Sequence, residues 1–394
     1  MSREIDKSAS ESGELDINKR IKILRIIARM NIGGPAVQVT GLMRELDPKL
    51  FEQRLVTGYV AADEADYLLE NKIDIPVTRV EGLGRSINIV ADLNAFFKLA
   101  KIIREYKPDI IHTHTAKAGV LGRTAWILAG YKPILVHTYH VHLLRGYFGK
   151  FKTNLVIVIE KTLGLLTNQL LAVGGKVADD LINVGIGSKK KFRIMAPGLS
   201  IDSIPDRREI CLKYQIDPNK FFCTFLGRVT EIKKPLRFLE IASKFKSANP
   251  NIHFLLIGSG ELLDDCKAKI TAEKLPVTSL GWIPKVEEAL VITDLMLLTS
   301  ENEGMPLSLI QAGMAYIPAI SSNVGSVSEV VLHEKTGYVL DFDKNEFSQK
   351  VVELYENPDL RVQLGVSANA YTTKHFSIKR LAEDHKDVYK NLIR

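Results

Sequence analysis

Short apolar runs of strand length alternate with segments of helical period along almost the whole chain, and this alternation is what most constrains the fold. Runs of this length, mainly apolar and bounded by polar or turn residues, are typical of buried parallel strands. They occur at 21–28, 53–59, 109–113, 134–138, 221–226, 252–257, 295–298 and 317–320, with helical patterns such as 88–106, 235–248 and 261–274 between them. The sequence therefore predicts an α/β protein with doubly wound parallel sheets.

The alternation is interrupted once, by a polar, proline-containing stretch from residue 198 to about residue 220. A chain of 394 residues is long enough for two domains. We therefore expect Rossmann-like domains at 21–197 and 198–376, followed by a helix at 377–394. Residues 1–20 are rich in Ser, Glu, Lys and Asp and lack the apolar core of a signal peptide, so a flexible tail is expected there.

The composition narrows the classes of protein to consider. With 46% hydrophobic and 25% charged residues, the chain is not a disordered one. The three cysteines, Cys211, Cys223 and Cys266, lie far apart, which predicts neither a disulfide framework nor a zinc module and favours a reduced, cytoplasmic setting. No run of about 18 apolar residues is present, so no membrane-spanning helix is expected.

The positive charge is concentrated in the first half of the chain. Residues 1–197 hold 29 Lys and Arg against 20 Asp and Glu, whereas residues 198–394 hold 24 against 26. Much of the excess lies between residues 82 and 161, where Lys98, Lys101 and Arg104 share one face of a predicted helix. The opposite face is predicted to contain Phe97, Ala100 and Ile103.

Two interpretations of this basic face remain open. It is either a solvated helix surface or a surface that attracts anionic phosphate, in lipid headgroups or in a lipid-pyrophosphate acceptor. Nucleic acid is not expected as a partner, because only 7% of the residues are aromatic and no base-stacking motif accompanies the charge.

Two loops that follow predicted strands are candidates for phosphate binding. Gly33 and Gly34 precede a predicted helix, where a backbone without side chains can approach an anion closely. An ordinary turn is the alternative, and no GxGxxG motif is present. In the second half, Arg228 and Lys233 lie on the loop before a helix start at Pro235 and could neutralise a diphosphate, unless they form only a basic surface turn.

The segment 300–313 is the most informative part of the chain. It leaves an apolar strand and enters a helix on which Leu307, Ile310 and Met314 are spaced for burial. Judged by structure alone, Glu303 is predicted to cap this helix, and Gln311 is a polar residue about two turns further on.

Two motifs of this chain resemble a known family. The first is a strand followed by Gly-Arg, a spacer and Lys, and the second is Ser-x-x-Glu-Gly-x-Pro-Leu-Ser-Leu-Ile-x-Ala. Together they resemble the group 1 (family 4) retaining glycosyltransferases of the GT-B fold, of the bacterial polysaccharide-biosynthesis type. The resemblance extends over nearly all of the chain after the tail, including the segments 109–114, 136–140, 258–260 and 323–329. It implies two domains that face each other across a cleft, with the donor on the second and the acceptor on the first, and a last helix, 377–394, that crosses back to the first domain.

The resemblance also implies roles for individual residues. Arg228 and Lys233 match the pair that holds the donor diphosphate in place of a metal ion, so no metal and no other cofactor is expected. Glu303 matches an acid that contacts the donor sugar, and His140 matches a histidine of the donor pocket. Gly33 and Gly34 match substrate-binding positions that would close over the diphosphate. The backbone N–H groups of the segment Gly304, Met305, Pro306 and Leu307 would approach the phosphates. Gln311 is the last substrate-binding position.

The sequence departs from the family pattern at three positions. Gln311 stands where the family has a glutamate that binds the ribose, and losing that charge would weaken recognition by roughly 1 kcal/mol. Tyr316 and Val141 stand where glycine is usual.

The implied activity is metal-independent transfer of a hexosyl group, with retention of configuration, from a nucleotide diphosphate sugar, with UDP favoured. The acceptor would be lipid-linked or a polysaccharide in cell-envelope glycan synthesis, at the inner face of the membrane. Gln311 keeps open a non-catalytic, donor-binding subunit of an assembly complex, and the architecture keeps open a sugar-nucleotide epimerase. A metal centre is a further alternative, built on His112, His114, His137, His140 and His142.

Overall fold

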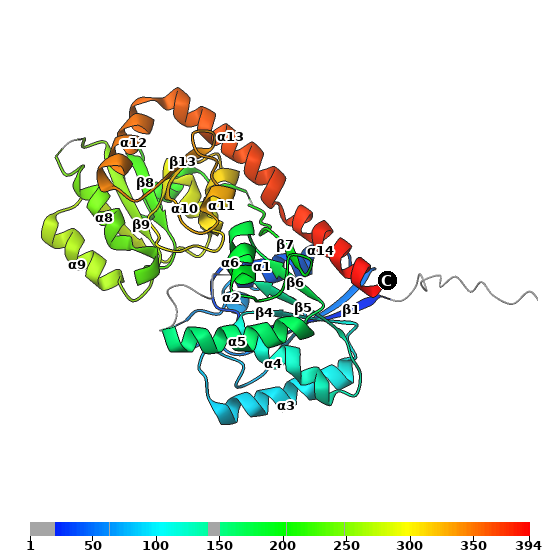
Figure 1. The fold of residues 1–394 in the computed structure, drawn as a ribbon. Coiled ribbons are helices and arrows are strands. Elements are labelled where there is room, and N and C mark those ends of the chain that lie inside the picture. The colour runs from blue at the N-terminus through cyan, green and yellow to red at the C-terminus, as the bar shows by residue number, and fades with distance from the viewer. Residues whose placement is uncertain (1–19, 63, 141–149, 202, 248) are drawn as a thin grey trace, which may run out of the picture.

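The computed structural model describes residues 20–62, 64–140, 150–201, 203–247 and 249–394. Two parallel sheets organise these residues (Figure 1), one of seven strands in the order β3-β2-β1-β4-β5-β6-β7 and one of six in the order β10-β9-β8-β11-β12-β13. The first contains β1 (Ile21–Ile27), β2 (Phe51–Thr57), β3 (Val77–Arg79), β4 (Ile110–His114), β5 (Ile134–Tyr139), β6 (Gln169–Ala172) and β7 (Phe192–Ile194). The second contains β8 (Phe221–Leu226), β9 (Ile252–Ile257), β10 (Val277–Gly281), β11 (Leu295–Leu298), β12 (Ala319–Ser322) and β13 (Gly337–Leu340). The predicted fold class is confirmed.

All eight predicted strands are present, and half of their sixteen ends shift by one or two residues. The strand expected at 317–320 begins at Ala319, because Tyr316 has a φ of 62° and Pro318 has no N–H to donate to a ladder. Five strands were not predicted: β3, β6, β7, β10 and β13, each only three to five residues long.

Helices cover both faces of the first sheet. On one face lie α3 (Ile89–Tyr106), α4 (Ala116–Ala125) and α5 (Lys150–Leu166), with α3 in contact with α4 and α4 with α5 (Figure 1). On the other lie α1 (Gly34–Glu45) and the C-terminal α14 (Ile378–Ile393). Strand β1 sends Ile23 into one core and Leu24 into the other, and neither side chain is exposed. Burial on both faces explains why the central strands are mainly apolar.

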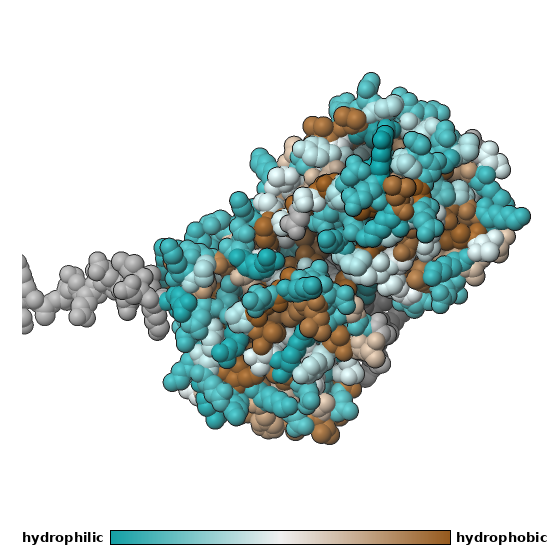
Figure 2. Space-filling view, turned by 180° about the vertical axis from the view of Figure 1, so that it is seen from behind, coloured by the Kyte–Doolittle hydropathy of each residue, from teal (hydrophilic) through white to brown (hydrophobic). Residues whose placement is uncertain are grey.

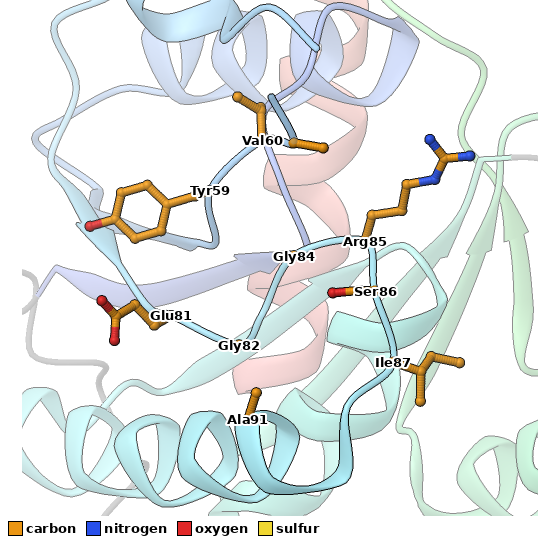
Figure 3. Close-up of a pocket in the computed structure, with 10 residues that line it drawn as sticks. Tyr59, Val60, Glu81, Gly82, Gly84, Arg85, Ser86, Ile87 and Ala91 are labelled. Carbon is orange, nitrogen blue, oxygen red and sulfur yellow. The ribbon is translucent and has the colours of Figure 1, made fainter. Parts of the chain in front are cut away.

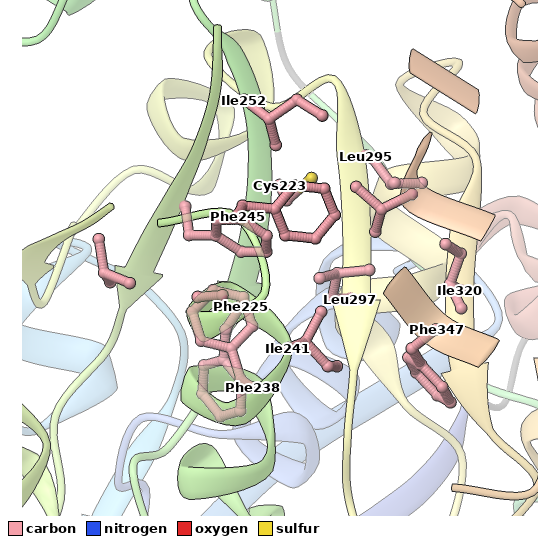
Figure 4. Packing of buried hydrophobic residues seen from close by; sticks show 14 of the residues in the cluster. Cys223, Phe225, Phe238, Ile241, Phe245, Ile252, Leu295, Leu297, Ile320 and Phe347 are labelled. Carbon is pink, nitrogen blue, oxygen red and sulfur yellow. The ribbon is translucent and has the colours of Figure 1, made fainter. Parts of the chain in front are cut away.

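The second sheet is also covered on both faces. In the larger core, Phe225 and Leu297 pack with Phe238, Ile241 and Phe347 (Figure 4). The surrounding helices are α7 (Arg207–Lys213), α8 (Pro235–Ser243), α9 (Leu263–Glu273), α10 (Val286–Val291), α11 (Leu307–Met314), α12 (Lys344–Glu356) and α13 (Pro358–Phe376). Helix α8 ends five residues earlier than predicted, where the backbone tightens into i→i+3 hydrogen bonds at residues 244 and 245.

The chain passes between the two sheets at two places, and these lie side by side. The N–H of Leu199 donates to the carbonyl of Phe376 over 2.8 Å, and the N–H of Ile378 donates to the carbonyl of Leu199 over 2.9 Å. Arg380 adds hydrogen bonds to the carbonyls of Ala196 and Pro197. Helix α14 then buries Leu381, Ala382, Val388 and Tyr389 against the first sheet, opposite α3 to α5.

The remaining described elements include α2 (Tyr67–Glu70) and α6 (Gly175–Asn183). Among the described residues, no helix combines the length and the apolar character that crossing a bilayer requires. Apart from Arg20, the expected tail lies outside the described residues, as do Val141 and His142.

Candidate active site

Four loops gather at the carboxyl edge of the second sheet, after β8, β9, β11 and β12. The backbones of these loops pack directly against each other, and at two of the contacts only glycine has room. A Cβ on Gly258 would lie 1.8 Å from the carbonyl oxygen of Gly227, and one on Gly325 would lie 1.8 Å from that of Glu303. Gly325 also has a φ of 53°. These contacts fix the loops that carry Arg228 and Glu303.

Lys233 and Glu303, 70 residues apart in the sequence, meet at this edge. The Lys233 ammonium donates to both carboxylate oxygens of Glu303, over 2.6 and 2.7 Å. The Ser300 hydroxyl donates to Oε1 of Glu303 over 2.6 Å, and the Glu303 side chain is 6% exposed. The carboxylate is therefore held on two sides by donors, which sets its direction.

The prediction that Glu303 caps α11 is wrong. The helix begins at Leu307 with Pro306 at the N-cap position, and no side chain caps it. Pro306 fixes the helix start three residues after Glu303, which leaves the carboxylate for Lys233. The bond from Ser300 was not predicted, although the spacing Ser-x-x-Glu was visible in the sequence.

The loop that carries Lys233 is anchored to the loop after β11. The N–H of Glu301 donates to the carbonyl of Ile232 over 2.9 Å. Lys234 forms ion pairs with Glu231 and Glu301, at 2.5 and 2.9 Å. These bonds position the lysine loop so that Lys233 points at Glu303.

Arg228 occupies the same loop but is placed differently. Its side chain is exposed, and within the described parts of the chain it has no ion-pair partner. One predicted cation is thus already bound to an acid, and the other is open to an anion from solution.

The segment after Glu303 leads into α11. Gly304, Met305 and Pro306 are buried, and Leu307 is half-buried. Gln311 is half-buried on the second turn of α11, and its side-chain amide has no hydrogen-bond partner among the described residues.

The first domain contributes Gly33 and Gly34, which stand at the start of α1. A Cβ on Gly34 would lie 3.4 Å from Cδ1 of Leu307, so the start of α1 lies against the start of α11. Gly33 has more room, because a Cβ there would come no nearer than 4.0 Å to the carbonyl oxygen of Asn31. The structure therefore brings these two sets of predicted residues together across the domains.

His140 follows β5 at the carboxyl edge of the first sheet. Its Nε2 lies 3.0 Å from Nδ1 of His114, the last residue of β4, which runs beside β5. Burial lowers the pKa of His140 to about 4, and burial together with the nearby His140 lowers the pKa of His114 well below 6.5. Both imidazoles are neutral at pH 7, so one ring donates and the other accepts.

Other histidines of the suggested metal centre have protein partners. His112 lies 2.7 Å from both the Tyr389 hydroxyl and the Thr138 hydroxyl, and His137 lies 2.8 Å from the Thr113 hydroxyl. Within the described ranges, no group of three or more His, Cys, Asp and Glu side chains is arranged to hold a metal ion.

A second link between the domains was not predicted. The Glu329 carboxylate accepts hydrogen bonds from the N–H groups of Gly175 and Lys176, over 2.9 and 3.1 Å, at the first turn of α6. A carboxylate at a helix N-terminus is stabilised by the helix dipole and by these unpaired donors.

Comparison with known proteins agrees with this arrangement. The family model described as "Glycosyltransferase Family 4" matches residues 32–203, and the one described as "Glycosyl transferases group 1" matches residues 206–371. The UDP-Gal:alpha-D-GlcNAc-diphosphoundecaprenol alpha-1,3-galactosyltransferase of Escherichia coli is 28% identical over 329 residues, which cover 80% of this chain and 83% of that protein. The O-antigen biosynthesis glycosyltransferase WbnH of Escherichia coli is 24% identical, over 93% of this chain and 98% of that one.

Solved structures are similar in fold. HepE of Anabaena, solved in complex with UDP and glucose, has a TM-score of 0.81 at 18% identity, over 94% of this chain and all of that one. A sucrose-phosphate synthase of Thermosynechococcus elongatus has a TM-score of 0.78 at 16% identity, over 95% of this chain and 99% of that one. The two family models together span most of the chain, and the chain therefore belongs to the group 1 (family 4) glycosyltransferases with the GT-B fold.

Proposed function

We propose that the protein transfers a hexosyl group from a UDP-sugar, with retention of configuration and without a metal ion, to a lipid-linked or polysaccharide acceptor in cell-envelope glycan synthesis. The reaction would take place at the cytoplasmic face of the membrane. The observation that carries the proposal is the meeting of Lys233 with the buried Glu303 beside the open Arg228, at the carboxyl edge of the second sheet.

This arrangement suits a reaction in which negative charge develops on a leaving diphosphate. Cations at the site stabilise such charge, and a cation that is already held in position does not have to reorganise during the reaction. Arg228 is open to the diphosphate, and Glu303 holds Lys233 at the edge where ligands of parallel sheets bind. Gly34, which faces Leu307, would close over the same ligand from the first domain.

The choice of donor and acceptor rests on relatives. The name of the Escherichia coli galactosyltransferase specifies a UDP-sugar donor and a diphosphoundecaprenol-linked acceptor, and HepE was solved with UDP and glucose. These names support a UDP-sugar and a lipid-linked acceptor for this chain.

We place His140 near the donor sugar, with a neutral imidazole that can hydrogen-bond as donor or acceptor. His140→Ala should slow transfer sharply while donor binding persists. Near-normal turnover would remove His140 from the site.

The test is to incubate the purified protein with a panel of nucleotide sugars and to measure binding and nucleotide release with and without a chelator. We expect chelator-insensitive release of UDP from one donor. Proton NMR of the product formed with an added lipid-linked acceptor should show the donor's anomeric configuration. Loss of activity on chelation, or an inverted product, would contradict the mechanism, and conversion of the sugar without acceptor would indicate an epimerase.

A further inference from the structure

The helix layer α3, α4 and α5 has apolar side chains on its outer surface as well as on its core-facing one. Twelve of the 23 large apolar side chains that are exposed in the described parts of the chain lie between residues 87 and 166. On α3 they include Ile89, Leu93 and Phe97, which are 84%, 54% and 53% exposed, and on α5 they include Leu155 and Val158. Apolar residues reach the lower edge of the rear view, where α3 lies (Figure 2).

Phe97 shows why this surface is unusual. The sequence pattern placed Phe97 on the buried face of the helix with Ala100 and Ile103, and that prediction is correct only for the latter two. The core under α3 is already filled by Leu99 and Ile103. Phe97 therefore extends into solvent: its ring contacts that of Phe96, with 5.6 Å between the centroids, and the residue remains 53% exposed. Exposed apolar patches of this kind mark interaction surfaces.

The segment of the sequence that includes this layer is rich in positive charge. Residues 82–161 contain 12 Lys and Arg against four Asp and Glu. Three of the four acids are in ion pairs: Glu160 with the buried Arg123 at 2.7 Å, Asp92 with Lys117 at 2.5 Å, and the exposed Glu105 with Lys101 at 3.8 Å. Lys98 lies 3.6 Å from Glu81 at the surface, and such exposed pairs are weak. On α3 the apolar residues of the first half are followed by the exposed Lys98 and Lys101. The surface is therefore both apolar and cationic.

One end of this surface lies at the carboxyl edge of the first sheet, where ligands of parallel sheets bind. Each helix of the layer runs back along the sheet, so the first turns of α3 and α5 lie at the carboxyl ends of the strands. A cavity of about 650 Å³ opens at the start of α3 and is lined by Tyr59, Glu81, Arg85 and Ile87 (Figure 3). The apolar surface and the cavity share Ile87, which is 85% exposed.

We propose that the outer surface of α3, α4 and α5 docks on an anionic bilayer. Leu93, Phe97 and the outer residues of α5 would insert between the headgroups, while Lys98 and Lys101 contact lipid phosphates. Charge selects this occupant, because a second copy of the chain would bring two cationic surfaces together. With the layer docked, the cavity opens beside the headgroups, where the lipid-linked acceptor of the proposed function would be presented.

The first test measures co-sedimentation with vesicles of phosphatidylcholine alone and of phosphatidylcholine mixed with phosphatidylglycerol. We expect binding only to the mixed vesicles, falling steeply as salt is raised. The double variant Leu93→Gln/Phe97→Gln should bind at least tenfold more weakly. The matched control is Val362→Gln/Val366→Gln on α13, where both residues are also more than half exposed; its binding should equal that of the unmodified protein.

A second pair of variants tests the charge. Lys98→Gln/Lys101→Gln should lose about fivefold in affinity for each charge removed, while Lys246→Gln/Lys267→Gln, exposed lysines of the second domain, should lose nothing. Equal binding of all variants, binding to neutral vesicles, or no vesicle binding would overturn the proposal. A dimer of the unmodified protein that becomes monomeric in Leu93→Gln/Phe97→Gln would also overturn the proposal, because a second copy would then cover the surface.

These measurements need no sugar donor, so they test the docking proposal independently of the proposed function. Donor binding, followed by calorimetry without vesicles, should be unchanged in all four double variants. If the unmodified protein binds vesicles but no nucleotide sugar, the docking surface stands and the proposed function fails.

Discussion

The carboxylate of Glu329 accepts a 2.9 Å hydrogen bond from the N–H of Gly175, although the two residues belong to different domains and lie 154 positions apart. A second bond joins the same carboxylate to the N–H of Lys176. Glycine is required beside this contact, because a Cβ on Gly174 would lie 2.4 Å from the hydroxyl oxygen of Ser326. One acid of the second domain thus caps a helix of the first.

Replacing Glu329 by glutamine should loosen this link between the domains. The amide keeps one acceptor but loses the charge that favours the helix N-terminus, a loss of about 1 kcal/mol. Hydrogen exchange at the amides of Gly175 and Lys176 should accelerate, while exchange in β8 stays the same. Glu356→Gln, a change at an exposed acid on α12, is the control and should alter neither. Unchanged exchange at α6 would show that the link carries no stability.

The sequence was sufficient to predict the central strands of each sheet. The strands β1, β4, β8 and β11 appear as mainly apolar runs, because helices cover both sides of each sheet. The edge strand β3 has only three residues, one of them exposed and two half-buried, so it leaves no such pattern. The order of the strands in each sheet depends on how the elements pack together, and the hydrophobic periodicity of the sequence does not specify it.

The site shows a similar division. Strand-to-helix loops of a parallel sheet share one edge, so Arg228, Lys233 and Glu303 could be assigned to one region from the sequence. The hydrogen bonds between them could not be predicted, because the contact of Lys233 with Glu303 depends on where α11 begins. Glu329 was visible only as a residue after a glycine turn, since its partners come from the other domain.

Lys233 should be required for turnover. Lys233→Ala removes a cation from the diphosphate site and leaves the buried carboxylate of Glu303 bonded only to Ser300. We expect kcat to fall by about 100-fold or more, as when other preorganised charge-stabilising groups are removed. Nucleotide release from the preferred donor measures the effect, and Lys246→Ala, an exposed lysine far from this edge, is the control. Turnover within twofold of the unmodified protein would exclude Lys233 from the diphosphate site.

Acid should destabilise the fold below about pH 6.5 because of buried neutral histidines. Burial lowers the pKa of His385 to about 3, and the pKa of His140 to about 4. Between these values and 6.5 the unfolded chain binds protons that the native state does not, so the free energy of unfolding falls as pH falls. Each such histidine contributes up to about 1.4 kcal/mol per pH unit.

Urea unfolding at a series of pH values measures this slope. His385→Gln removes one such group and should make the slope shallower between pH 4.5 and 6. The unmodified protein is the reference for this slope. The same slope in both proteins would mean that His385 is protonated in the native state.

Gln311 distinguishes an active transferase from a donor-binding subunit. The family pattern has a glutamate at this position, and Gln311 lies half-buried on α11, two turns after the Glu303 segment. In an enzyme with the expected donor site, Gln311→Glu supplies a charged acceptor for the ribose hydroxyls. We expect the dissociation constant for the nucleotide sugar to fall by about fivefold, which corresponds to roughly 1 kcal/mol.

Calorimetric titration of the donor measures this change, with Gln363→Glu as the control, because it adds the same charge at an exposed position on α13. Turnover should be retained or raised in Gln311→Glu and unchanged in Gln363→Glu. A degenerate subunit would gain neither affinity nor turnover from the added carboxylate. Weaker donor binding by Gln311→Glu alone would show that the pocket has adapted to the neutral amide, because an added charge without a partner is unfavourable in a partly buried site.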